Sequence, residues 1–193
     1  EGPRGKRRSR TARSSRIPPA AEAWRADAEA LIHEMVDWDT LVQRSLGASR
    51  WDKLVPKEQE RFTKLLRSLI EASYQSKMKL AVREKDEAKP GEVKIKWTDE
   101  ELRPDEARLA ARVTADKGHV DLEFHLSRNG DAWRLYDLVI DGSSTVRLYR
   151  SMFRQIIRDE GWDGLMARLQ KKLDDVKAGR GDFVPGDQAT TDG

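Results

Sequence analysis

Two short stretches of the sequence carry residue types that could do chemistry. The first is Ser143 and Ser144, which directly follow the apolar run "WRLYDLVI", where a strand could present a nucleophile. A serine nucleophile of this kind needs the pattern G-x-S-x-G and a histidine partner. The segment "GSSTV" lacks the second glycine, and no histidine is a credible partner. We therefore interpret the two serines as N-cap residues of a following helix, a position that serine strongly prefers.

The second stretch is "HVDLEFH", residues 119–125, where two histidines and two acidic residues alternate on one face of a predicted strand. Alternate residues of a strand lie about 6.6 Å apart, whereas zinc holds its ligands at about 2 Å. At most two neighbours could bind one ion, so we expect a solvated sheet face with cross-strand ion pairs. We predict no metal, no cofactor and no catalytic residue. Asp137 with Tyr136 is the only acid–base pair that could support an enzyme.

The charge of the chain is unevenly distributed. The sequence has 193 residues, no cysteine and a net charge of +3. Residues 1–16 contain seven Lys or Arg and one Glu, a local charge of +6, so the remainder carries −3. The predicted organisation is a disordered basic arm over 1–18, a single domain over 19–177, and a disordered tail over 178–193. The tripeptide "RGD" at 180–182 is interpreted as a coincidence within that tail.

Apolar residues at three- and four-residue steps predict the helices. Such a pattern runs from Trp24 to Val36, and a short helix follows to Leu46, with Gly47 as its C-cap. Pro56 suits the first turn of the longest helix, which continues to about residue 80. Two more helices follow residue 144, separated at Gly161.

Alternating apolar residues predict about four antiparallel strands between residues 93 and 140. A turn at Lys117-Gly118 would pair Val113 with Leu122 and Arg112 with Glu123. A second turn at Asn129-Gly130 would pair Leu126 with Trp133 and Phe124 with Leu135.

The register of the last strand is open. Continued pairing places Asp137 beside Leu122 on the apolar face, and a buried carboxylate needs partners. Either an Arg or a hydroxyl holds Asp137, or a bulge shifts the register. The competing phase, with Tyr136, Leu138 and Ile140 inward, is about equally apolar. The element order indicates an α+β fold, with helices packed over a curved, roughly four-stranded antiparallel sheet.

Several segments together resemble the MlaC, or toluene-tolerance, family of periplasmic phospholipid-binding proteins. The resemblance runs from about Val36 to Lys172 and includes "WRLYDLVIDGSS" and "VRLYRSMFRQIIRDEGWDGLMARLQKK". The matching positions are Leu46, Gly47, Trp51, Gln59, Phe62, Tyr74, Trp133, Tyr136, Asp137, Leu138, Gly142, Ser144, Tyr149, Arg150, Phe153, Gly161, Leu165 and Leu169. Leu148 and Met152 depart from the family pattern, which often has Asn and Gln there.

The resemblance implies a phospholipid carrier with a lipid cavity between its helical and sheet layers. It would shuttle lipid between an outer-membrane lipoprotein complex and an inner-membrane ABC transporter that together maintain outer-membrane lipid asymmetry. The implied cargo is a bound phospholipid, and the protein is expected to be a monomer that binds no nucleic acid. No targeting segment is visible near residue 1, so a periplasmic location is implied by the resemblance alone.

The expected lipid-lining residues are the inward positions of the predicted helices and strands. They are Phe62, Leu66, Ile70, Tyr74, Val113, Leu122, Phe124, Tyr149, Phe153 and Ile157. Arg147 and Arg150 are candidates for attracting the lipid phosphate at the mouth. For any one lining residue, packing in a filled core is the competing interpretation. The alternative function is an adaptor that binds an anionic surface or nucleic acid through its basic arm.

Overall fold

The computed structural model describes residues 34–85, 93–115, 118–181 and 183. The described residues from Met35 onward belong to one compact unit. The described elements are α2 (Trp38–Leu46), α3 (Ala48–Trp51), α4 (Pro56–Lys85), β1 (Lys94–Leu102), β2 (Glu106–Ala115), β3 (Gly118–Asn129), β4 (Ala132–Ile140), β5 (Ser143–Ser144) and α5 (Thr145–Lys177). The basic arm and most of the helix expected over 24–36 lie outside the described residues. The domain boundaries at 18 and 177 remain predictions.

Asp37 joins the start of α2 to the sheet. Its carboxylate accepts a hydrogen bond from the Thr40 backbone N–H at 3.0 Å, as an N-cap does, and a second from the Ser127 hydroxyl on β3. Its own N–H donates to the Leu135 carbonyl of β4 at 2.8 Å. Burial alone would raise the pKa of Asp37, but the hydrogen bonds from Ser127 and Thr40 lower it below its ordinary value. The first turn of α2 is therefore fixed to two strands.

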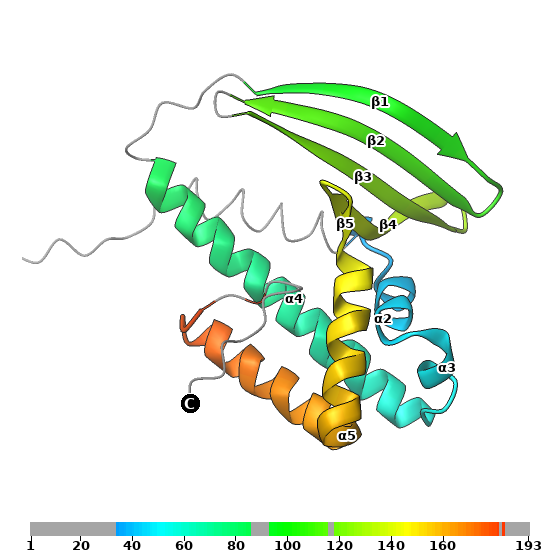
Figure 1. Ribbon diagram of the computed structural model, residues 1–193, viewed down its shortest axis with the longest axis vertical. Coiled ribbons are helices and arrows are strands. Elements are labelled where there is room, and N and C mark those ends of the chain that lie inside the picture. Colours follow the sequence, from blue (N-terminus) through cyan, green and yellow to red (C-terminus); the bar gives the residue numbers. More distant parts are fainter. Residues whose placement is uncertain (1–33, 86–92, 116–117, 182, 184–193) are drawn as a thin grey trace, which may run out of the picture. The chain divides into compact units, whose positions relative to one another are not determined.

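Helices α2, α4 and α5 enclose the main hydrophobic core (Figure 1). Pro56 begins α4, as the sequence predicts, and Gly47 ends α2 with a φ of 90°. Helix α5 bends at Gly161, whose φ of 75° and ψ of −174° are not helical. This is the expected break, and the left-handed φ suits glycine because it has no Cβ. The bend lets both arms of α5 contribute buried residues to the core.

The strands form an antiparallel meander in the order β1-β2-β3-β4-β5 (Figure 1). The short β5 was not predicted; it pairs with the end of β4 and leads directly into α5. Helix α5 contacts β4 and β5, and α2 contacts β4, so β4 joins the sheet to the helical layer. The mixture of helices with an open antiparallel sheet confirms the α+β fold class.

The predicted pairing of the two hairpins is wrong by two residues. Ala115 pairs with Gly118, so Val113 lies opposite Val120, and Arg112 opposite Asp121 instead of Glu123. Likewise Leu126 pairs with Leu135 and not with Trp133. The first turn was predicted one residue too late along the chain and the second one residue too early. Because side chains alternate with a period of two, this error leaves each residue of β2 and β3 on its predicted face.

A bulge in β4 settles the question left open at Asp137. Leu126 pairs with Leu135 but His125 pairs with Asp137, so Tyr136 is the extra residue. Beyond the bulge, Leu138 pairs with Phe124 and Ile140 with Leu122 on the apolar face. Asp137 therefore does not lie beside Leu122, and it is buried on the opposite face.

Candidate functional site

The sheet has one continuous apolar face across β1, β2 and β3. The pairing aligns Ile95 with Val113 and Val120, and Trp97 with Ala111 and Leu122. The Trp97 and Phe124 rings lie 6.0 Å apart across the intervening strand. Ile95 is 63% exposed and Trp97 62% exposed, although both are large apolar side chains. A contiguous exposed apolar surface of this kind marks a binding site in soluble proteins.

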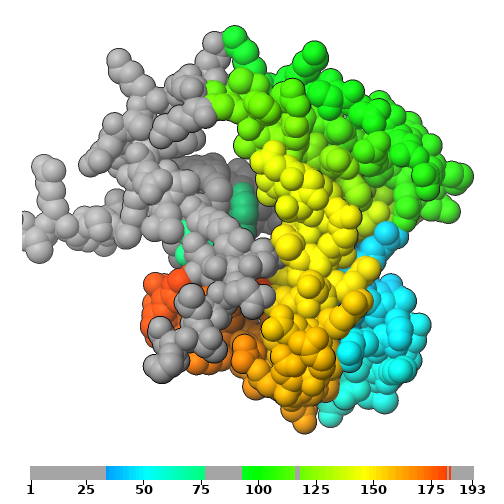
Figure 2. All heavy atoms as spheres, viewed as in Figure 1, coloured from blue at the N-terminus to red at the C-terminus, as the bar shows by residue number. Residues whose placement is uncertain are grey.

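The space-filling view shows an opening below the sheet. In Figure 2 it lies under the green strands, and the yellow first arm of α5 borders it on one side. At the bulge of β1, Trp97, Asp99, Glu100 and Leu109 line a further hollow of about 540 Å³. Thr98 is the extra residue of this bulge. The pairing after Thr98 places Glu100 opposite Leu109, and so the bulge brings a polar residue to this hollow.

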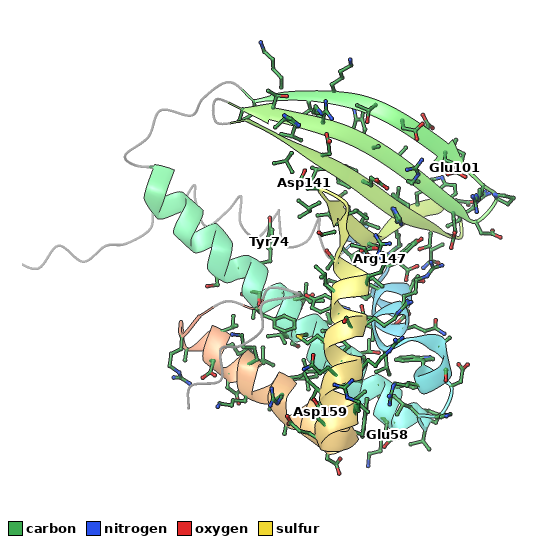
Figure 3. All side chains as sticks on the ribbon, viewed as in Figure 1. Glu58, Tyr74, Glu101, Asp141, Arg147 and Asp159 are labelled. Atoms are coloured by element: carbon green, nitrogen blue, oxygen red, sulfur yellow. The ribbon has the colours of Figure 1, made fainter. Side chains whose placement is uncertain are left out.

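The lipid-lining residues expected on the sheet lie together. Val113, Leu122 and Phe124 are half-buried side chains on the apolar face. Ile70, Tyr74 and Ile157 of the helices are also half-buried. Figure 3 shows that Tyr74 projects from α4 on the side toward the sheet. These residues have the partial exposure that a lining residue requires.

The other expected lining residues pack in a filled core. Phe62 and Leu66 have no exposed surface, and Phe153 is 1% exposed. The Phe62 and Phe153 rings meet edge to face at 5.6 Å, and Tyr149 stacks on Phe153 at 5.7 Å. Such aromatic pairs stabilise a core beyond their buried area. These side chains support the helical layer from within.

Two further aromatic residues join this cluster although the sequence interpretation did not include them. Trp162 lies 5.5 Å from Phe62, and Phe183 stacks on Tyr149 at 5.3 Å. Trp162 directly follows the Gly161 break, a signal that it could turn inward. Phe183 comes from the predicted disordered tail, yet it is 8% exposed and belongs to the core cluster. A single aromatic residue without periodic neighbours gave no signal of burial.

Arg147 and Arg150, the candidates for binding a phosphate, have different surroundings. The Arg150 guanidinium donates twice to the Arg44 carbonyl, at 2.8 and 2.6 Å, and so satisfies the C-terminal end of α2. Arg147 is exposed and makes a long contact of 3.4 Å with the Gly142 carbonyl. Arg147, labelled in Figure 3 at the start of α5, is the more available cation of the two.

Asp137 is the buried carboxylate of the fold, and its partners are structural. It accepts a hydrogen bond from the Ser144 hydroxyl and one from the Val146 N–H at 3.0 Å. Ser144 in turn caps α5 by accepting from the Arg147 N–H at 3.0 Å. The Tyr136 ring lies under the Arg44 guanidinium, 4.2 Å from it. Through these contacts, Asp137 joins β4 to α5 and Tyr136 joins β4 to α2.

The "HVDLEFH" strand carries cross-strand ion pairs, as expected. Arg112 holds Asp121 through two hydrogen bonds of 2.7 and 2.8 Å, and Glu123 lies 3.4 Å from both Arg108 and His125. No group of three metal-binding side chains occurs within residues 34–85, 93–115, 118–181 and 183. Within the same ranges, no helix is long and apolar enough to cross a membrane.

The structure is an α+β binding fold. Its antiparallel sheet has an open apolar face, and its helical layer is filled with its own side chains. The family model for the MlaC protein matches residues 10–171 of this chain. The chain therefore belongs to the MlaC family.

Seven chains among solved structures match this one. One is a phospholipid-binding protein from Ralstonia solanacearum, solved in complex with a phospholipid. The likeness has a TM-score of 0.64 at 17% identity and covers 82% of this chain and 88% of the other. At that identity, it establishes a shared fold. No curated protein sequence matches the chain.

Proposed function

We propose that this protein is a soluble periplasmic phospholipid carrier. It would carry lipid between an outer-membrane lipoprotein complex and an inner-membrane ABC transporter, and so maintain outer-membrane lipid asymmetry. The observation that carries the proposal is the exposed apolar face of β1–β3 in a chain of the MlaC family. The shared fold with a protein that holds a phospholipid supports it.

An acyl chain suits the chemistry of this face. Large apolar side chains such as Ile95 and Trp97 are more than half exposed, and covering them with hydrocarbon removes them from water. Burial of each lipid methylene is worth about 0.8 kcal/mol relative to water. A carrier must also release its cargo to a membrane. Its affinity for the phospholipid should therefore not greatly exceed that of the bilayer, and a partly open site is consistent with this requirement.

The proposed lipid position uses both the half-buried residues of the sheet and the half-buried residues of the helices. The tails would lie along Val113, Leu122 and Phe124, with Tyr74 and Ile157 on the helical side. Phe62, Leu66, Phe153 and most of Tyr149 would support this wall from behind and not touch the tails along their length. Arg147 would attract the phosphate, since its guanidinium is exposed, whereas Arg150 is occupied by the Arg44 carbonyl.

A carrier of this type needs no catalytic group, and we propose that the protein is not an enzyme. The one acid–base pair considered, Asp137 with Tyr136, is engaged in holding β4 to α2 and α5. The cargo would be the only bound small molecule, and the protein would act as a monomer that docks in turn on its two membrane complexes.

Two neighbouring residues of β2 allow a matched test of the cargo position. Val113 lies on the apolar face and Thr114 on the opposite, solvent-facing side. Val113→Glu would place a carboxylate against the lipid tails, and burying an unpaired charge is strongly unfavourable. We expect this variant to take up lipid at least about tenfold less well than the native protein, since a loss of 1.4 kcal/mol already gives that factor.

The measurement is the uptake of a fluorescent phospholipid from vesicles of phosphatidylethanolamine and phosphatidylglycerol, followed by separation of protein from vesicles. Thr114→Glu adds the same charge one residue away and should take up lipid like the native protein. Equal uptake by the two variants would show that lipid does not lie on this face of the sheet.

A further inference from the structure

The first arm of α5 carries arginines along one side. This arm, residues 145–160, runs from the sheet to the bend of α5 (Figure 1). The arginines follow one another at steps of three or four residues, and such residues are neighbours on one face of a helix. At about 1.5 Å per residue, they form a line of positive charge about 16 Å long. We define this arginine stripe as Arg147, Arg150, Arg154 and Arg158.

The stripe keeps most of its positive charge. No acidic residue lies between its members in the sequence, and among the described residues only Arg158 forms an ion pair, with Asp159. That pair is exposed, and exposed ion pairs contribute little. Arg147 and Arg150 donate to backbone carbonyls, which leave the charge of a guanidinium in place.

Most of the stripe is accessible from outside. Arg147, Arg154 and Arg158 are exposed, and Arg150 is half-buried because its side chain lies against Gly47 at the end of α2. A guanidinium matches the geometry of phosphate and carboxylate groups, to which it can donate two parallel hydrogen bonds. An accessible line of such groups therefore suits a surface that carries many anions.

We propose that the arginine stripe is the surface through which the protein meets an anionic phospholipid membrane. This inference rests on the proposed function, because a carrier must collect its cargo from a bilayer. Arg147 begins the stripe at the start of α5, and Asp159 marks its other end (Figure 3). Since Arg147 is also the residue that would attract the phosphate of the bound lipid, the stripe continues the proposed headgroup position along the helix. This continuity favours lipid phosphates over the carboxylates of an acidic protein as the occupant.

A contact of this kind should depend on salt and on lipid charge. The attraction of basic residues to an anionic membrane falls off within a Debye length, about 10 Å at 0.1 M salt. A stripe that lies along the membrane surface brings all its guanidinium groups within that distance. Binding should therefore weaken as salt rises, and it should be weaker on vesicles of phosphatidylcholine, which carries no net charge.

Co-sedimentation of the full chain with vesicles of phosphatidylethanolamine and phosphatidylglycerol at low salt tests the proposal. The double variant Arg154→Gln with Arg158→Gln removes two charges of the stripe and leaves Arg147 in place. Its apparent affinity for these vesicles should fall about thirtyfold, the factor expected for the loss of two basic contacts with an anionic surface. Both positions are exposed, so the fold should be unaffected.

The double variant Lys171→Gln with Lys177→Gln is the matched control. Both lysines are exposed on the second arm of α5, beyond the bend, and their replacement changes the net charge equally. This variant should bind the vesicles like the native protein. The basic segment 1–16 is the same in all three proteins, so its contribution to binding does not distinguish them.

Uptake of a fluorescent phospholipid, measured on the same proteins, separates this inference from the proposed function. If the stripe variant binds the vesicles as tightly as the native protein, or if the control loses as much affinity, the inference is wrong, and the carrier function stands where lipid is still taken up. If the native protein takes up lipid without binding anionic vesicles, the inference is also wrong, and an acidic protein becomes the occupant of the stripe. If the stripe variant alone loses vesicle binding but no protein takes up lipid, the membrane contact is supported and the proposed function fails.

Discussion

Replacement of Phe153 by Ala should lower the free energy of unfolding by about 4 kcal/mol, the largest effect expected of any single change considered for this protein. The Phe153 ring is 1% exposed and contacts Phe62 edge to face and Tyr149 by stacking. Its removal loses the transfer free energy of the ring and leaves a cavity that three helices cannot close. Urea unfolding of the lipid-free protein, followed by circular dichroism, measures the change.

The neighbouring residue provides the control. Arg154→Ala, on the exposed face of the same helical turn, should change the free energy of unfolding by no more than about 0.5 kcal/mol. If Phe153→Ala cost less than about 1 kcal/mol, the ring would not be part of a filled core. Phe153 would then be better placed as a lining residue of an empty slot, as the sequence first suggested.

Asp137→Ala should cost about 3 kcal/mol, because it leaves the Val146 N–H and the Ser144 hydroxyl buried without their acceptor. The lost hydrogen bonds lie at the junction where β4, β5 and the start of α5 meet. Asp131→Ala, an exposed aspartate in the turn before β4, is the matched control and should be nearly neutral in the same urea experiment. Equal stability of the two variants would mean that Asp137 does not organise the start of α5.

The conservative change Asp137→Asn addresses function separately. Lipid uptake should be unaltered per folded molecule, because Asp137 lies away from the apolar face of the sheet. A selective loss of lipid uptake in a variant that remains folded would argue that the carboxylate acts on the cargo and would reopen the enzyme interpretation.

The faces of β2 and β3 were predictable from the sequence although their pairing was not. The turn residues allowed two placements that differ by one position, and each keeps apolar residues opposite apolar residues. A pairing error of two residues does not change which side chains share a face, so the apolar row from Val113 to Phe124 was found correctly.

The end of β4 was not predictable in the same way. Both phases of "WRLYDLVI" are about equally apolar, so hydrophobic patterning cannot locate the bulge at Tyr136. Two side-chain contacts accompany the bulge. The Arg44 guanidinium, which is distant in sequence, lies over the Tyr136 ring, and the Ser144 hydroxyl, seven residues away, donates to the Asp137 carboxylate. The sequence left two alternatives, an Arg or hydroxyl partner for Asp137 or a bulge that shifts the register, and the structure shows the bulge together with a hydroxyl partner, Ser144.

The surroundings of two kinds of residue could not be predicted from the sequence, for a physical reason. Periodicity identifies the inward face of a helix, but it does not distinguish a filled core, such as that around Phe62, from the wall of an open site. Phe183 has no periodic neighbours at all, and its burial depends on the chain reversal after α5. Tertiary contacts decide both cases.

The most direct test of the carrier proposal is the mass of the protein as bacteria make it. The full chain, purified from a Gram-negative host without detergent, should show in native mass spectrometry a species heavier than the polypeptide by the mass of a phospholipid. Extraction with organic solvent should release about one equivalent of phospholipid and leave the polypeptide mass alone. A folded protein that carries no phospholipid, and takes none from vesicles, would contradict the account.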